Sequence, residues 1–240
     1  WFKATLQDAP GLTRGLIDEV KIQRAFADYE KQRRPSFDSP SYLNSGHQGQ
    51  IYWFLRRYWS GLFGGDMNDA FGYSAAFTRR VRPGLMAKVV ADVRAMTPFM
   101  TRRLPLDQHD LGWYQLDWHY YRRHLFGPLL RHPLNPGWDR HTVTDVESIL
   151  RQHKTLLRRQ ARWFTHGDFY PNNVLVTNHR RRPVVVFDWE LAHLNLATWD
   201  SVMVSLLSWR SPNWQSTFSR AARARLPKGK QTEQLWALAT

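Results

Sequence analysis

The sequence predicts an α+β fold in two lobes, and three observations support it. Ile51–Leu55 is a dense apolar run with strand character, and apolar residues recur at helical spacing over Gly15–Tyr29. A further helical pattern precedes two short β-branched runs, Val174–Val176 and Val184–Phe187. We therefore expect an N-terminal α+β lobe over residues 1–58 and a mostly helical C-terminal lobe over residues 59–240.

The first half of the chain shows further strand, loop and helix patterns. Pro83-Gly84 interrupts an otherwise helical apolar pattern, so two helices are expected on either side of it. The aromatic-rich segment 111–130 has the composition of a helix-packing core, although it could also form one wall of a substrate site. The expected elements are a strand end at 1–4, a loop at 6–13, a polar loop with at most a short strand at 31–50, helices within 69–96 and a connector at 98–110.

The second half predicts helices on both sides of the two β-branched runs. Thr144 and Glu147 form a capping box, so a helix is expected to begin there and to run to about Trp163. A loop over 191–198 should lead into a helix over 201–210, with Asp200 as its N-cap. The remaining expected elements are a loop at 132–141 and a basic segment at 211–240 with a short apolar turn at 235–239.

Composition excludes several classes of protein. With 240 residues, of which 42% are hydrophobic and 22% charged, the chain is long and apolar enough for a globular core. The absence of cysteine excludes a disulfide framework and thiolate chemistry. No apolar run approaches the length of a membrane span, which predicts a cytoplasmic protein without a membrane partner. Because the chain begins with Trp1, we expect its N-terminus to be incomplete.

The formal net charge of +14 leaves two interpretations open. Basic residues interleaved with 12 tryptophans suit single-stranded nucleic acid, so a basic nucleic-acid-binding protein remains an alternative. The other interpretation is a positive field that attracts an anionic ligand such as ATP. No nucleic-acid-binding motif accompanies the charge, which favours the second interpretation.

The stretch His166–Glu190, HGDFYPNNVLVTNHRRRPVVVFDWE, carries the residues best suited to chemistry. Its two apolar runs predict an antiparallel hairpin, with Val174 opposite Phe187 and Val176 opposite Val185. Asn173 then lies opposite Asp188, and directly opposed residues have Cβ atoms about 5 Å apart. A carboxylate and an amide oxygen at that separation are suitable ligands for a hard cation.

The spacing of these residues resembles that of kinases. Asp168 precedes Asn173 by five residues, and a strand, a turn and a second strand then lead to Asp188. Gly167 and the Asp-Trp-Glu triplet at 188–190 are unlike protein kinases, and the pattern HGD-x4-N followed by DWE resembles the aminoglycoside phosphotransferase and choline kinase-like family. A buried hairpin without a ligand, or a binuclear metallophosphatase using Gly-Asp and Asn, are the alternatives. A metallophosphatase would need more histidine ligands downstream than His193.

This resemblance implies a protein-kinase-like fold and an ATP-dependent phosphotransferase acting on a small molecule. The alternatives are a protein or lipid-headgroup kinase and an inactive kinase-like binding module. Two strands and a phosphate-covering loop would precede residue 3, so the N-terminal lobe would be incomplete. The implied roles are a catalytic base at Asp168, Mg²⁺ ligands at Asn173 and Asp188, a nucleotide-binding pair at Lys3 and Glu19, supporting residues His166, Glu190 and Asp200, and adenine contacts near 57–59.

The charge of the last forty residues bears on the second substrate. Residues 201–240 contain one acidic residue, Glu233, and the six basic residues Arg210, Arg220, Arg223, Arg225, Lys228 and Lys230. Such a segment would repel a polycation, whereas the aromatic residues within 113–121 could hold an apolar or sugar-like acceptor. We therefore expect a neutral or anionic hydroxylated metabolite rather than an aminoglycoside.

Overall fold

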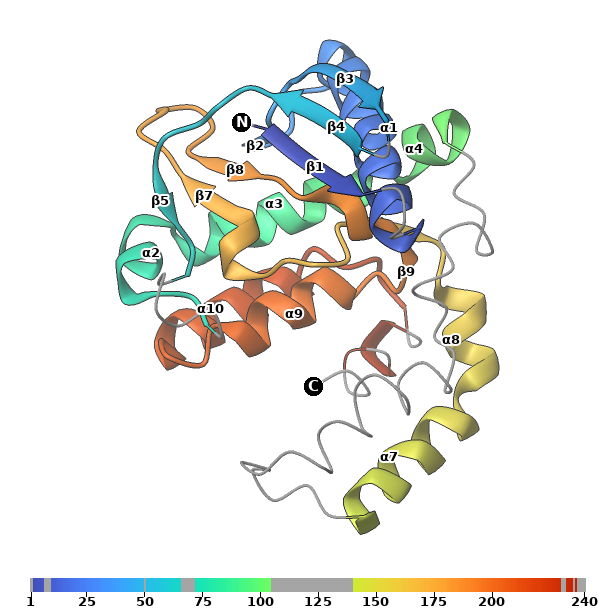
Figure 1. Ribbon diagram of the computed structural model, residues 1–240. Coiled ribbons are helices and arrows are strands. Elements are labelled where there is room, and N and C mark those ends of the chain that lie inside the picture. Colours follow the sequence, from blue (N-terminus) through green and yellow to red (C-terminus); the bar gives the residue numbers. More distant parts are fainter. Residues whose placement is uncertain are drawn as a thin grey trace.

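The structure is a computed structural model that describes residues 2–6, 10–49, 51–65, 72–104, 140–229, 232–234 and 236. It is an α+β fold. A small sheet of β1, β3 and β4 lies beside α1 at one end, and α3, α9 and α10 lie together at the other (Figure 1). The hairpin β7–β8 runs between these two parts (Figure 1). Among the described helices, none has the length and apolar composition needed to cross a membrane.

The first sheet places Lys3 beside the first helix. β1 (Phe2–Leu6) and β3 (Tyr42–Gln48) both pair antiparallel with β4 (Ile51–Arg56), so the strand order is β1-β4-β3. Lys3 lies opposite Phe54, whose buried ring packs against Leu16 and Val20. These two residues belong to α1 (Pro10–Gln32), which covers the sheet.

Two expectations for this lobe were wrong. The loop expected over 6–13 is helical from Pro10 on, because α1 begins there with a proline, a residue tolerated in the first helical turn, where no N–H is needed. The polar loop expected over 31–50 contains the seven-residue strand β3. Its polar sequence gave no strand signal, and the strand is stabilised by its backbone pairing with β4.

The second sheet contains the expected hairpin. Its strand order is β2-β8-β7-β5, with β7 (Val174–Val176) antiparallel to β8 (Val184–Val186), and every residue of these two strands is buried. β5 (Leu62–Phe63) extends the sheet on one side, and β2 (Phe37–Asp38) pairs parallel to β8 on the other.

The hairpin register differs from the prediction by one residue. Val174 lies opposite Val186 and Val176 opposite Val184, so Asn173 does not lie directly opposite Asp188. The cause is the turn, where the Thr177 backbone N–H donates to the Pro183 carbonyl at 2.7 Å and closes a shorter loop than expected. Asn173 instead meets Phe187, whose N–H donates to the Asn173 carbonyl at 3.1 Å.

The middle of the chain follows the predicted helical pattern in part. α2 (Ala75–Arg80) and α3 (Pro83–Ala95) are separated just before Pro83, as predicted, because proline is favourable at the start of a helix and not within one. The connector expected over 98–110 was wrong for its first residues, since α4 spans Thr97–Arg103 with Pro98 in its first turn. The aromatic segment 111–130 lies outside the described residues, as does most of the loop expected over 132–141. The last two residues of that loop are helical instead, because α7 begins at Arg140.

The approach to the hairpin also differs from expectation. The helix expected from Thr144 begins earlier, so Thr144 is not its cap, and it breaks at His153 into α7 (Arg140–Gln152) and α8 (Lys154–Gln160). The end of the predicted helix is instead β6 (Trp163–Thr165), which pairs antiparallel with β9 (His193–Asn195) in the segment expected to be a loop. This two-stranded sheet brings Thr165 beside His193 and so fixes both ends of the stretch that follows.

The C-terminal helices complete the core. α9 (Trp199–Leu207) matches the helix expected over 201–210, but its N-cap is Thr198 and Asp200 lies in its first turn. α10 (Pro212–Arg223), within the expected basic segment, was missed, although its buried Trp214, Phe218 and Ala222 recur at helical spacing. Trp214 and Phe218 stack with ring centroids 5.3 Å apart, and the Trp214 indole donates to the Val81 carbonyl at 2.7 Å. The apolar turn expected at 235–239 lies mostly outside the described residues.

Candidate active site

The loop that leaves β6 is held by a buried carboxylate. Asp200 in α9 accepts hydrogen bonds from the backbone N–H groups of His166 at 2.9 Å and Gly167 at 3.1 Å. Burial raises the pKa of Asp200 to about 7, against the effect of these two donors and of Arg94. Asp200 therefore anchors the loop from the first turn of α9.

Gly167 turns the chain at this point. Its φ of +83° is in the left-handed region, and a Cβ atom there would lie 2.2 Å from the Leu191 carbonyl oxygen. Only glycine fits both the backbone angle and the space. This turn directs the next residue, Asp168, toward the end of the hairpin.

His166 supports the loop from inside the core. Its Nε2 lies 3.0 Å from the Phe187 carbonyl oxygen and its Nδ1 accepts from the Asp168 backbone N–H at 3.3 Å, which assigns the proton to Nε2. Burial lowers the pKa of His166 to about 4. With both nitrogens engaged in the neutral form, His166 is placed to connect the loop to the hairpin rather than to exchange protons.

Asp168 and Asn173 are joined directly. The Asn173 Nδ2 donates to the Asp168 carboxylate at 2.8 Å and to its backbone carbonyl at 3.0 Å. Burial and the like charge of Asp188 together raise the pKa of Asp168 to about 6, against the Asn173 hydrogen bond, which lowers it. Because the Asn173 amide nitrogen faces Asp168, the amide oxygen of Asn173 can accept a hydrogen bond from another group or bind a cation.

Asp188 ends the hairpin in an unusual backbone conformation. Its φ of +67° makes it the one residue other than glycine with a positive φ in the described part of the chain. Trp189 beside it is fully buried, stacks on Phe164 and donates from its indole to the Ser39 hydroxyl at 2.9 Å. The buried tryptophan thereby holds the flanking carboxylates of Asp188 and Glu190 at the edge of the core.

Lys3 lies at the centre of three carboxylates. Its Nζ is 2.6 Å from Asp188 Oδ1, 2.8 Å from Glu190 Oε2 and 3.1 Å from Glu19 Oε2. Burial would lower the pKa of Lys3, but the charges of Glu19 and Asp188 outweigh it and raise the pKa above its ordinary value. The structure thus brings together residues that are 16, 185 and 187 positions from Lys3 in the sequence.

Glu19 has an additional cationic partner that the sequence did not reveal. It is fully buried and contacts Lys3, the amide of Gln23 at 3.0 Å and the guanidinium of Arg56 at 3.0 Å. Arg56 is 5% exposed, at the end of β4. Its carbon Cζ lies 5.3 Å from the ring centroid of Phe187, the neighbour of Asp188. Strand alternation was the available signal, since Phe54 and Arg56 are two residues apart on the same face of β4.

The donor set fits a hard divalent cation. Glu19, Asp188 and Glu190 each offer an oxygen, and these three atoms lie within 4.8 Å of one another. Carboxylate oxygens are ligands that Mg²⁺ prefers in proteins. Asn173, just before β7, is connected to this group through Asp168, whose pKa the charges of Asp188 and Glu190 raise. The Lys3 ammonium among the three carboxylates indicates that this site accommodates a positive charge.

The residues proposed as catalytic, metal-binding, nucleotide-binding and supporting lie together in this one region. Asp168, Asn173 and Asp188 surround the open end of the hairpin, and Lys3, Glu19 and Glu190 join them through the ammonium contacts. His166 and Asp200 lie behind the loop. Arg57–Trp59, expected near the adenine, follow β4 directly and are held by a backbone hydrogen bond from Arg57 N to Ser41 O at 2.9 Å.

Comparison with solved structures identifies the same fold in other proteins. The complex of APH(2″)-IIia with GDP and kanamycin aligns over 99% of this chain and 76% of that chain, with a TM-score of 0.58 and 12% identity. Aminoglycoside phosphotransferase APH(3″)-Id from Streptomyces rimosus, in complex with ADP and streptomycin, aligns over 99% and 84%, with a TM-score of 0.55 and 14% identity. Macrolide 2′-phosphotransferase MphH from Brachybacterium faecium aligns over 99% and 74%, with a TM-score of 0.51 and 15% identity.

Sequence comparison identifies the family. No curated protein sequence matches this chain. A sequence profile described as the phosphotransferase enzyme family, APH, does match it, over residues 6–236. That match covers nearly the whole chain and includes the loop, the hairpin and the Asp-Trp-Glu triplet. The chain therefore belongs to the APH phosphotransferase enzyme family.

Proposed function

We propose that this protein transfers the γ-phosphoryl group of ATP to a hydroxyl group of a small-molecule metabolite. The observation that carries the proposal is the pair of hydrogen bonds from Asn173 to Asp168. These bonds support the proposal because they hold the carboxylate proposed as the base next to the amide proposed as a metal ligand, near the end of a hairpin that leads to Asp188. Phosphoryl transfer needs these groups together, because its catalysis consists mainly of positioning and charge stabilisation.

Asp168 is the proposed base. With its pKa raised to about 6, the carboxylate is ionised at neutral pH and is still a better proton acceptor than an exposed aspartate. The Asn173 hydrogen bond to Oδ2 fixes the carboxylate plane, so Asp168 would orient the acceptor hydroxyl and take up its proton as the bond to phosphorus forms.

Asn173 and Asp188 are the proposed magnesium ligands, and Glu190 is a proposed outer-shell partner. When bound, magnesium would neutralise part of the negative charge on the nucleotide phosphate oxygens. Lys3 is the proposed phosphate-binding cation, and it pairs with Glu19, which Arg56 also contacts. The adenine would lie near Arg57–Trp59, at the end of β4.

The acceptor we propose is a neutral or anionic hydroxylated metabolite. Kanamycin and streptomycin, bound in two of the structures with this fold, are polycations, which a carboxylate-rich pocket would suit. In this chain Glu233 is the single acidic residue of 201–240, and it pairs with Arg223. The other basic residues of that segment have no acidic residue within 201–240 to balance their charge. This charge balance disfavours a polycationic acceptor.

The experiment is a phosphorylation screen with ATP labelled at the γ-phosphate. Purified protein is incubated with magnesium and a panel of aminoglycosides, sugars, amino alcohols and hydroxy amino acids, and labelled product is counted for the unmodified chain and for Asp168→Asn. We expect transfer to a neutral or anionic acceptor that Asp168→Asn lacks. Transfer to aminoglycosides alone would contradict the acceptor class. No transfer, together with no magnesium-dependent stabilisation by nucleotide, would contradict the function itself.

A further inference from the structure

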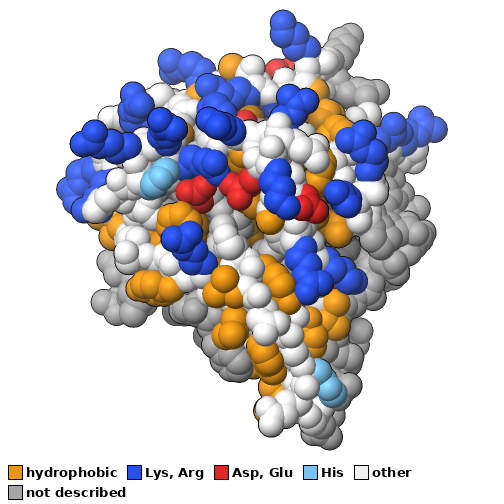
Figure 2. Space-filling view, turned by 90° about the horizontal axis from the view of Figure 1, so that it is seen from above, with side chains coloured by type: hydrophobic (Ala, Val, Ile, Leu, Met, Phe, Trp, Pro, Cys, Tyr) orange, Lys and Arg blue, Asp and Glu red, His pale blue; other side chains and the backbone are white. Residues whose placement is uncertain are grey.

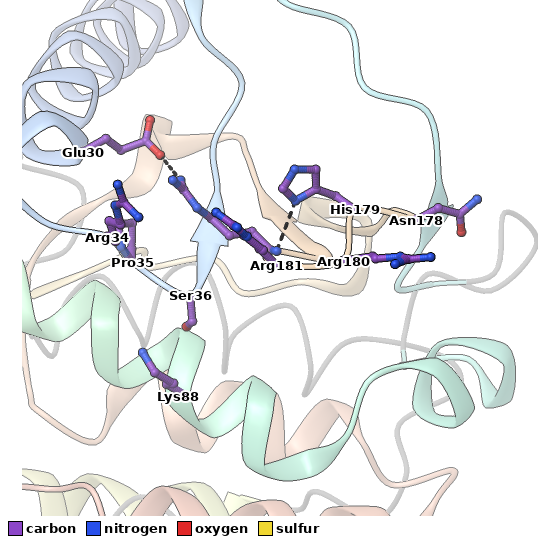
Figure 3. Close-up of a pocket in the computed structure, with 10 residues that line it drawn as sticks. Glu30, Arg34, Pro35, Ser36, Lys88, Asn178, His179, Arg180 and Arg181 are labelled. Carbon is purple, nitrogen blue, oxygen red and sulfur yellow. Dashed lines mark hydrogen bonds and ion pairs between the residues drawn. The ribbon is translucent and has the colours of Figure 1, made fainter.

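A cavity lies at the β7–β8 turn, at the opposite end of the hairpin from Asn173 and Asp188. Its volume is about 1050 Å³, and it opens where the β7–β8 turn faces the end of α1 and one side of α3 (Figure 3). None of the residues to which we assign a role in phosphoryl transfer lines it. The lining residues are Glu30, Arg34, Pro35, Ser36, Lys88, Asn178, His179, Arg180, Arg181 and Arg182.

The lining is strongly cationic, and part of its charge is compensated within the protein. Arg182 contacts the carboxylates of Glu30 and Asp38, which connects the turn to α1 and to β2. Lys88 pairs with Asp92 one helical turn further along α3, at 2.7 Å. These contacts account for two of the five cationic side chains that line the cavity.

The other three are Arg34, Arg180 and Arg181. All are exposed, and none has a carboxylate partner in the part of the chain that the structure describes. Arg34 and Arg181 approach the cavity from different elements, whereas Arg180 extends away from Arg34 and Lys88 (Figure 3). Lys and Arg side chains outnumber Asp and Glu on the face seen in Figure 2, and they gather densely on its left side.

Uncompensated guanidinium groups around a hollow suit a ligand with several negative charges. Like charges held close together repel one another, and an anion placed between them removes that repulsion. Arginine presents a planar fork of N–H donors that matches phosphate geometry, which lysine does not. The positive field of the whole chain, at +14, adds a long-range attraction for anions.

We propose that this cavity binds a small molecule carrying two or more phosphate groups, at a site separate from the nucleotide site. Its volume is close to the upper end of the range for small-molecule pockets, which is about 300–1000 Å³. A single-stranded nucleic acid fits less well, because its binding grooves use aromatic side chains for base stacking. None of the residues lining the cavity is phenylalanine, tyrosine or tryptophan.

The test measures binding of inorganic triphosphate by isothermal titration calorimetry, with chelator present and without acceptor. Triphosphate could also occupy the nucleotide site, so all proteins carry Lys3→Met, which removes the proposed phosphate-binding cation there. The pocket variant adds Arg34→Gln and Arg181→Gln. The control variant adds Arg79→Gln and Arg80→Gln instead, which removes the same charge from two exposed arginines in the last turn of α2.

We expect the pocket variant to bind triphosphate at least about ten-fold more weakly, from the loss of charge-assisted hydrogen bonds. The control variant should stay within about two-fold of its parent, because distant exposed charges are screened by salt. Circular dichroism melts verify that the variants are folded, and Arg34→Gln alone provides a milder variant. The assay contains neither magnesium nor acceptor, so failure of the proposed phosphoryl transfer would leave its result unaffected.

Three results would overturn the proposal. Equal weakening in the pocket and control variants would mean that triphosphate responds only to net charge. Unchanged binding in the pocket variant would place the ligand elsewhere. Pocket-dependent binding of a single-stranded oligonucleotide, without measurable triphosphate binding, would assign the surface to nucleic acid.

Discussion

The Asn173 side chain donates to the Asp168 carboxylate at 2.8 Å, across the turn that joins the loop to β7. The same amide donates to the Asp168 backbone carbonyl at 3.0 Å, so both residues have one defined relative orientation. This arrangement couples the proposed base to a proposed metal ligand. It also implies that substitutions at the two positions should have different and separable effects.

Asp168→Asn should lower turnover about 10²- to 10⁴-fold, the contribution of a positioned general base. Nucleotide affinity should change little, because Asp168 has no proposed contact with the nucleotide. The measurement is kcat for the acceptor found in the screen, together with the Kd of nucleotide from calorimetry. Asp28→Asn, at an exposed carboxylate, is the control and should match the unmodified chain. Near-normal turnover in Asp168→Asn would disprove the role of Asp168.

Asp188→Ala should abolish the magnesium dependence of nucleotide binding. The substitution removes the proposed metal ligand and also the closest contact of the Lys3 ammonium, at 2.6 Å. Glu190→Gln should retain most of the dependence, since Glu190 is proposed as an outer-shell partner only. Thermal stabilisation by nucleotide, measured with and without magnesium, checks both variants. If magnesium increased the thermal stabilisation by nucleotide equally in Asp188→Ala and in the unmodified chain, the assignment would be refuted.

Arg56→Gln should lower the free energy of unfolding by about 2–3 kcal/mol. It leaves the buried Glu19 carboxylate with one cation instead of two, and breaking a buried ion pair is costly. The neighbouring Arg57→Gln, at an exposed position, should be nearly neutral. Urea unfolding curves provide the comparison. Adding Glu19→Gln to Arg56→Gln should cost less than the sum of the single substitutions, because the two residues interact. Additive costs would show that they are independent.

Gly167→Ala should destabilise the fold by more than about 2 kcal/mol and eliminate activity. The new Cβ would lie 2.2 Å from the Leu191 carbonyl oxygen, at a φ that alanine disfavours. Gly84→Ala in α3 is the matched control, since beyond its own stretch of helix backbone a Cβ there would meet no atom within 4 Å. It should be neutral or stabilise by about 0.5 kcal/mol, because alanine is the better helix former. Equal melting temperatures for the two variants would contradict this account.

The buried His193 should make the fold sensitive to acid. Burial lowers the pKa of His193 to about 4, and its Nδ1 and Nε2 are both engaged in the neutral ring, with the Leu191 carbonyl and the Asn195 amide. The unfolded chain, with an ordinary pKa of about 6.5, binds the proton first. Stability from this group is therefore complete above pH 6.5 and is lost as the pH falls toward 4.

The check is the difference in unfolding free energy between the unmodified chain and His193→Gln, measured from about pH 7.5 to 4.5. The difference should shrink by about 2–3 kcal/mol over that range. Burial raises the pKa of Asp168 and Asp200, which gives the opposite pH dependence. Because both proteins contain these two residues, their contributions cancel in the difference. A difference that does not vary with pH would show that His193 does not titrate between the two states.

Local patterns in the sequence predicted the elements whose signal is short-range. The β-branched runs predicted β7 and β8, and Pro83 predicted the break before α3. The spacing of Asp168, Asn173 and Asp188 predicted a kinase-like arrangement, because the loop and the hairpin are continuous in the sequence. The match of the family profile over residues 6–236 agrees with that resemblance.

Tertiary structure decided what depends on distant partners. β3 and β9 are strands because β4 and β6 supply their backbone hydrogen bonds, and neither has an apolar pattern of its own. The hairpin register was set by the Thr177–Pro183 hydrogen bond, which residue types alone do not specify. The ion pair of Arg56 with Glu19 required β4 to pack on α1, which joins residues 37 positions apart. Burial explains this ion pair, because Glu19 and Arg56 are both removed from water and a buried charge is costly without a partner of opposite charge.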